Sequence, residues 1–194
     1  AQVGTSANIE LEGANSGIAA TADASNAVTV NISNSEGAAG TEINSVGVNA
    51  AAATGSLSVT VDDGMDYEGT ISANAVTGTV AVNIDGEMSN TAQIDANAAN
   101  TVDIGSVDTT SSLAFNAANA SVLTVQAGEN LTLTGDLNAV SQMTIDTDGA
   151  FNFSAFTLTG VESADFTGSG SAVLGDLGSV THGSNMTVDA SGLT

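Results

Sequence analysis

The feature that most constrains the fold of this chain is an apolar–polar–apolar triplet that returns about every 21 residues. The last residues of its copies stand at positions 61, 84, 104, 125, 145, 166 and 188, so the steps are 23, 20, 21, 20, 21 and 22 residues. Turn-forming residues follow each copy, as Asp85-Gly86 follows Ile84. Period-2 alternation inside a fixed repeat is typical of short strands that stack coil upon coil. The pattern predicts an all-β fold, a β-solenoid with about 20 to 23 residues per coil.

A second apolar pair follows the triplet in most repeats, and a third, weaker one ends some of them. The second pairs are Leu113/Phe115, Leu131/Leu133 and Phe151/Phe153, with Ile71 and Ile94 as poorer copies; the third are Leu137/Val140, Phe156/Leu158/Val161 and Leu177/Val180. Each coil is therefore expected to carry two or three short strands. The alternative is a β-sandwich or jelly roll, which also has short strands with frequent turns. The constant step of the triplet favours the solenoid.

Residues 1–55 follow the repeat poorly. Within them, residues 28–32 alternate as a strand does, residues 43–48 form a second strand pattern, and residues 50–53 are four alanines that resemble a connector. Solenoids need a cap at an open end, and a free segment can instead add a strand to a neighbouring subunit. We expect an N-terminal cap or strand-exchanging arm over residues 1–55 and the repeat region over residues 56–194; the sequence leaves the choice between cap and arm open.

The charge of the chain excludes several classes of partner. It has no Lys or Arg and 22 Asp plus Glu, which gives a net charge of −22. A chain without fixed cations cannot neutralise phosphates, so we expect it to bind neither nucleic acid nor anionic lipid surfaces. No apolar run approaches the roughly 20 residues of a membrane-spanning helix, so membrane insertion is not expected.

The inventory of reactive side chains argues against an enzyme. The chain has no Cys, and its one imidazole, His182, stands in a turn-like Thr-His-Gly-Ser segment. A histidine can act as a general base, but no Cys, Lys or Arg accompanies it as nucleophile or electrophile. We expect His182 to be an exposed loop residue and the protein to have no enzymatic activity.

Calcium is the chemistry that this composition favours. Ca²⁺ prefers oxygen ligands from carboxylates and carbonyls, and acidic residues gather at two turns. Within the solenoid, the residues after one strand should lie close to those after the strand one coil later, and Glu129 should lie near the second cluster. The alternative is a solvated acidic edge without a specific ion. The candidate metal ligands are Asp62, Asp63, Asp66, Glu68, Asp85 and Glu87 at the first cluster, and Asp146 and Asp148 at the second.

The start and composition of the chain favour export. It begins Ala-Gln without a methionine, as a chain does after a signal peptidase has cut behind a small-residue site. The absence of Cys removes disulfides and thiolate metal sites and fits a bacterial exported protein. We therefore expect a secreted protein located outside the cell or at the cell surface.

Polar residues recur at the middle of the triplet and should form a ladder on the outer surface. Regular threonine ladders occur in ice-binding proteins, but Asn and Asp interrupt this one, so ordinary polar decoration of a strand is favoured over ice or mineral binding. The expected ladder consists of Thr60, Asn83, Asp103, Thr124, Thr144, Asp165 and Thr187.

The segments 131–135 (LTLTG), 143–149 (MTIDTDG) and 156–161 (FTLTGV) show the style of the repeats. In this respect residues 56–194 resemble the repetitive portions of secreted bacterial surface proteins, S-layer proteins and large adhesins. The resemblance is one of style and matches no family signature. It implies a structural, self-assembling and often Ca²⁺-dependent role.

The physics of a solenoid also favours assembly. Its end strands offer unpaired edges that promote polymerisation, and the chain has neither Lys nor Pro to block them. Head-to-tail contacts that do not close generate filaments. We therefore expect an extracellular structural protein that self-assembles into a filament or S-layer-like lattice, with itself and Ca²⁺ as partners. The alternatives are an adhesin fragment that binds a ligand or an ice- or mineral-binding protein.

Overall fold

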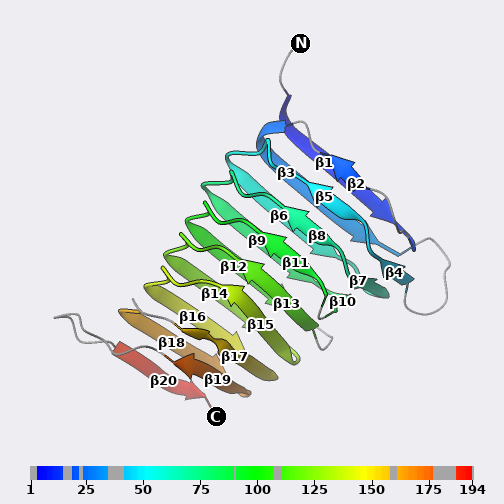
Figure 1. Ribbon diagram of the computed structural model, residues 1–194. Coiled ribbons are helices and arrows are strands. Elements are labelled where there is room, and N and C mark those ends of the chain that lie inside the picture. The colour runs from blue at the N-terminus through cyan, green and yellow to red at the C-terminus, as the bar shows by residue number, and fades with distance from the viewer. Residues whose placement is uncertain are drawn as a thin grey trace.

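The computed structural model describes residues 4–14, 19–21, 24–34, 42–89, 91–106, 111–157, 161–176 and 187–193. Over these residues all regular secondary structure is β-strand, and the strands form three parallel sheets. The strands stack along one axis, with the N-terminal strands at one end and the C-terminal strands at the other (Figure 1). The fold is a β-solenoid, as the repeat predicts. No helix that could span a membrane is found among the residues described.

The longest sheet, sheet A, takes one strand from each successive coil. Neighbouring strands pair in parallel, so the chain returns to the same side of the molecule before each new strand begins. The nine strands of sheet A, in spatial order, are β1 (Gly4–Glu12), β3 (Ala24–Ser33), β6 (Ser56–Val61), β9 (Thr79–Ile84), β12 (Thr101–Ser106), β14 (Val122–Ala127), β16 (Gln142–Thr147), β18 (Ser163–Gly168) and β20 (Thr187–Leu193).

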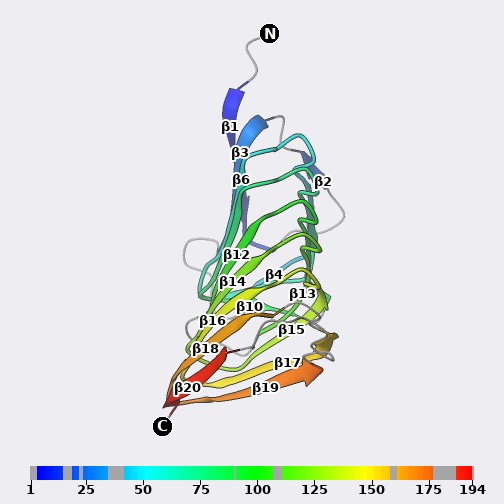
Figure 2. The same ribbon diagram turned by 90° about the vertical axis from the view of Figure 1, so that its left-hand side faces the viewer.

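Sheet B lies opposite sheet A across the coils, as Figure 2 shows, and sheet C adds a third side to three coils near the N-terminal end. The coils that begin with β3, β6 and β9 therefore have three strands, and the coils that begin with β12, β14, β16 and β18 have two described strands each. Sheet C contains β4 (Glu42–Asn44), β7 (Met65–Tyr67) and β10 (Glu87–Met88). Sheet B contains β2 (Ala19–Thr21), β5 (Gly47–Asn49), β8 (Thr70–Ser72), β11 (Gln93–Asp95), β13 (Ser111–Asn116), β15 (Leu131–Asp136), β17 (Ala150–Thr157) and β19 (Ser171–Asp176).

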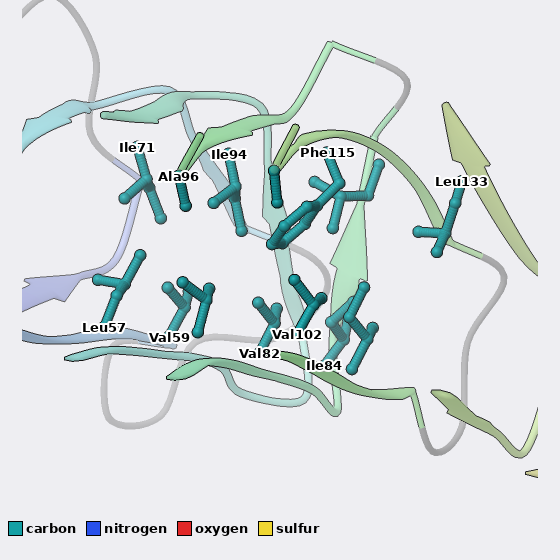
Figure 3. Close-up of a cluster of buried hydrophobic side chains, with 14 of the residues drawn as sticks. Leu57, Val59, Ile71, Val82, Ile84, Ile94, Ala96, Val102, Phe115 and Leu133 are labelled. Atoms are coloured by element: carbon teal, nitrogen blue, oxygen red, sulfur yellow. The ribbon is translucent and has the colours of Figure 1, made fainter. Parts of the chain in front are cut away.

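Alternating small aliphatic residues build the core. In β6, Leu57, Val59 and Val61 are buried, whereas the residues between them are half-buried on the outside. The register places Leu57 beside Val80 and Val59 beside Val82 in the next coil, so each inward column is apolar along the axis. Figure 3 shows this row facing a second one from sheet B, which includes Ile71. Burying each such side chain contributes about 1.5–3 kcal/mol.

A four-residue turn closes the coils between sheet B and sheet A. Its fourth N–H donates to the carbonyl of its first residue, for instance Ala99 to Ala96 at 2.9 Å and Val140 to Leu137 at 3.2 Å. The first and fourth side chains are buried in each case. Leu137 and Val140, predicted as a third weak element, therefore belong to this turn, and the third strand of the three-sided coils lies elsewhere, in sheet C.

The predicted register is wrong at two steps. Ile104 pairs with Val82 rather than with Ile84, which instead pairs with Ser106. Near the C-terminal end, Val188 pairs with Ala164 rather than with Phe166. Both slips are of two residues, so the inward residues stay inward, because side chains alternate with a period of exactly two residues along a strand.

The outward ladder of polar residues also changes register between β9 and β12. Asn83 lies beside Gly105, and Asp103 lies beside Ala81. The predicted run from Thr60 through Asn83 to Asp103 is therefore wrong, since Asn83 and Asp103 belong to different columns. From Asp103 onward the predicted order is right through Thr124, Thr144 and Asp165, but Asp165 pairs with Asp189 and not with Thr187.

The N-terminal segment continues the same sheets. Strand β3 pairs with β6 in sheet A, and β5 pairs with β8 in sheet B, so neither sheet breaks at the predicted boundary between residues 55 and 56. The strand predicted over residues 43–48 is instead two strands, β4 and β5, on different sheets. Asn44 ends β4 as a buried residue whose Nδ2 donates to the Gly13 carbonyl at 3.1 Å. Capping and strand exchange stay predictions.

Candidate functional site

The structure stacks two of the predicted acidic turns directly upon each other. Val61 pairs with Ile84, so Asp62 and Asp85 both begin the corner that follows sheet A. The backbone fixes this corner, because the N–H groups of Asp85 and Gly86 both donate to the Val61 carbonyl, at 2.8 and 3.0 Å. Asp63 is exposed at the same corner. The expected proximity of Asp62 to Asp85 is therefore found.

The next acidic residues of these coils lie on sheet C. Asp66 of β7 pairs in register with Glu87 of β10, so Glu87 lies beside Asp66. Asp66 is half-buried and its Oδ1 is buried without a hydrogen-bond partner. Burial raises the pKa of Asp66, the charges of Glu87 and Glu68 raise it further, and the backbone N–H of Ser89 lowers it. Of the predicted metal ligands, Asp66 is therefore the one whose negative charge is stabilised least by its surroundings.

The chain has no Lys or Arg with which to neutralise this pair. A proton or a cation from the medium is left to do so. Ca²⁺ takes six to eight oxygen ligands, more than two aligned carboxylates supply. Across the described ranges, no three acidic side chains are arranged to hold a metal ion. Asp66 and Glu87 are thus the two predicted ligands that the strands bring side by side.

The second predicted cluster is already hydrogen-bonded. Asp148 Oδ1 accepts from the backbone N and the Oγ of Ser169, at 3.1 and 2.9 Å, and these bonds lower its pKa. Asp146 Oδ1 accepts from Thr167 Oγ1 at 3.0 Å. The backbone of Glu129 lies against Gly149 at this corner, as expected. Asp146 and Asp148 also border a shallow depression of about 230 Å³ on the outer face of sheet A.

Hydrogen-bonded ladders of polar side chains on the turns and on sheet B were not predicted. Asn97 Nδ2 donates to Asn74 Oδ1 at 2.9 Å, and Asn116 Nδ2 donates to Asp95 Oδ1 at 2.7 Å. The partners are 23 and 21 residues apart. The spacing of Asn and Asp at one repeat length is the sequence signal that points to them. These bonds satisfy polar groups on the turns and on sheet B without any ion.

The remaining sequence predictions concern His182 and the aromatic residues. His182 lies outside the described residues. Phe115, Phe151 and Phe153 are fully buried, as their alternation predicts, and the rings of Phe151 and Phe153 stack with centroids 5.6 Å apart. These rings therefore stabilise the core rather than form a surface for binding.

Comparison of the chain with protein-family models, with curated proteins and with solved structures found no match.

Proposed function

We propose that this chain is an extracellular structural protein that assembles with copies of itself into a filament or an S-layer-like lattice, with Ca²⁺ at its acidic turns. The observation that carries the proposal is that each of the two outer strands of sheet A has a partner strand on one side only, among the described residues. Among the described residues, β1 pairs only with β3, and β20 pairs only with β18. A strand with a free edge is a template for a strand of another chain.

The inward residues of β1 support contact through this edge. Ala7 and Ile9 are half-buried and pack against the core on one side only, over Val28 and Val30. A strand added in the same register would cover them as the inner coils cover their own residues. A contact between opposite ends is heterologous and does not close, so it generates a linear polymer.

Charge supports the role of a divalent ion. Each copy carries −22, so contacts between copies are opposed by repulsion unless cations gather between them. The aligned Asp66 and Glu87 are the first places where such a cation would be favoured. Ligands missing on one chain would then come from water or from a second copy.

Negative-stain microscopy and sedimentation velocity of the chain, with Ca²⁺ and with a chelator, test the proposal. Polymers in Ca²⁺ that dissolve in chelator are the expected result. Dispersed monomers under both conditions would reject assembly, whereas polymers under both conditions would reject only the role of the ion.

A matched pair of variants locates the contact. Ile9→Glu places a charge on the inner side of β1, where an added strand would pack. Ser6→Glu adds the same charge to the exposed outer side of the same strand. We expect the first to abolish polymers and the second to leave them, with both keeping the β-sheet circular dichroism of the inner coils, because solenoid coils contact only their neighbours.

A further inference from the structure

Two shallow depressions join into one groove on the outer face of sheet A. The first, of about 230 Å³, and the second, of about 170 Å³, share Asn83, Gly105 and Gln126. Their lining residues come from β6, β9, β12, β14 and β16, so the groove crosses five neighbouring strands along the solenoid axis. At about 4.8 Å per strand, four steps make a groove of about 19 Å.

Gly105 forms the floor where the two depressions meet, and no structural reason requires a glycine there. Its backbone does not have a positive φ. A Cβ at this position would lie 3.2 Å from Asn83 Oδ1, the far end of a side chain, and 4.0 Å from the nearest backbone atom, the Val82 oxygen. Glycine inside a strand is destabilising, and it often marks a place where a ligand approaches the backbone.

Three polar residues next to this floor have side chains that make no hydrogen bond to the rest of the described chain. Asn83, Asp103 and Gln126 are exposed, and none of their side chains hydrogen-bonds to another residue within the described part of the chain. Asn83 and Gln126 stand on either side of Gly105 in one column, so the glycine separates two amides that could otherwise form a ladder. By contrast, Asn97 and Asn116 are bonded to the coils next to them.

Charge defines the class of ligand. Asp103 lines one depression and Asp146 and Asp148 line the other, and the chain has no Lys or Arg to neutralise them. Carboxylates accept hydrogen bonds only, and amides both donate and accept. A ligand with ammonium or guanidinium groups along an extended backbone complements these groups. Since the chain has no Lys or Arg, that ligand cannot be a second copy of it.

We propose that the groove across β6 to β16 binds an extended Lys- or Arg-bearing segment of a different protein, seated on Gly105 between Asn83 and Gln126. An extended chain rises about 3.3 Å per residue, so the groove holds about six residues. This role goes beyond self-assembly, because it concerns a lateral face and a different partner. The attachment is expected to weaken with salt, as contacts between exposed charges do.

Titration of the ¹⁵N-labelled chain with hexalysine tests the proposal at low and at physiological ionic strength. We expect the side-chain amide signals of Asn83 and Gln126 and the backbone signal of Gly105 to shift most. Maltohexaose and Ca²⁺ are titrated separately. If either of these moves the same signals and hexalysine does not, the proposed ligand class is wrong.

Two matched pairs of variants separate the groove from general attraction to an acidic protein. Asp103→Asn and Asp165→Asn each remove one negative charge from an exposed position of the same column. Asp103 lies inside the groove, and Asp165 lies outside it. We expect the first to weaken hexalysine binding about threefold and the second to change it little. Gly105→Gln should fill the floor and reduce binding without lowering the melting temperature, whereas Ser163→Gln, on exposed β18 surface, should not reduce it. Equal losses within either pair would overturn the proposal.

Discussion

Asp66 of β7 and Glu87 of β10 lie directly beside each other in the parallel register of sheet C. Like charges at such cross-strand positions are destabilising. The chain has no Lys or Arg to neutralise the pair, and one oxygen of Asp66 is buried without a hydrogen bond. The fold therefore keeps a local electrostatic cost at this place, which a proton or a cation removes.

The first prediction follows from the raised pKa of Asp66. Its ordinary value is 3.8, and the folded state holds the proton more readily than the unfolded state does. The stabilising contribution of Asp66 is therefore complete below pH 3.8 and is lost as the pH rises through the raised pKa. We expect Asp66→Asn to raise the free energy of unfolding at neutral pH by a few tenths to about 1 kcal/mol, and to flatten its fall with increasing pH. Urea unfolding across the acidic to neutral range measures both effects.

Asp63→Asn is the control for this prediction. Asp63 is exposed at the preceding turn, and the substitution removes the same unit of charge from the chain. If it flattens the pH dependence as much as Asp66→Asn does, total charge rather than the Asp66–Glu87 pair is responsible.

The fold was predictable because its signal repeats in every coil. Residues such as Val59 and Val82 alternate with polar ones and return at a nearly constant step, and this combination specifies stacked parallel strands. The register between β9 and β12 was not predictable in the same way. Val82 and Ile84 both point inward, and pairing Ile104 with either one buries an apolar side chain. The choice depends on the length of the turns between the strands, which the triplet pattern does not contain.

The candidate site was predictable only in part. Asp62 and Asp85 follow two paired residues directly, so their common corner follows from the spacing. The burial of Asp66 depends on sheet C, whose strands of two or three residues are too short to leave a pattern. The Asp148 carboxylate is bonded by Ser169 one coil later, and no local feature of the sequence indicates this.

The second prediction concerns Gly135, which pairs with Phe115 in sheet B. Its φ is +118°, and a Cβ there would run into the Phe115 carbonyl. Gly135→Ala therefore combines backbone strain with a clash against the backbone of Phe115, whose side chain is fully buried, and we expect it to cost about 2 kcal/mol or more. Thermal or urea unfolding measures the loss. Gly105→Ala is the control, because the nearest atom to a Cβ there is the end of a side chain, Asn83 Oδ1 at 3.2 Å, and its φ is not positive; we expect it to stabilise by about 0.5–1 kcal/mol.

The third prediction tests the asparagine ladder at the turns. Asn97 donates to Asn74 Oδ1 at 2.9 Å and accepts from the Ala118 N–H at 3.3 Å. Asn97→Ala removes both bonds, so we expect it to lower the free energy of unfolding by about 1–2 kcal/mol. Asn138 is also the second residue of its four-residue turn and is exposed, and its side chain has no hydrogen bond within the described residues. Asn138→Ala should change stability by less than about 0.5 kcal/mol. Equal effects would show that the ladder contributes nothing.

The fourth prediction separates a specific Ca²⁺ site from general screening of an acidic surface. An ion that binds only the folded state stabilises it by about 2.7 kcal/mol at a hundred times its dissociation constant, so Ca²⁺ should raise the melting temperature of the native chain. Glu87→Gln removes one member of the aligned pair, and Glu162→Gln removes an exposed carboxylate after Val161, far along the chain from that pair. We expect the Ca²⁺-dependent shift in melting temperature to shrink in the first variant and to persist in the second. Na⁺ at equal ionic strength should produce no such shift in either variant. Equal Ca²⁺ shifts in both variants would assign the stabilisation to the net charge of the whole chain and would remove Asp66 and Glu87 from the site.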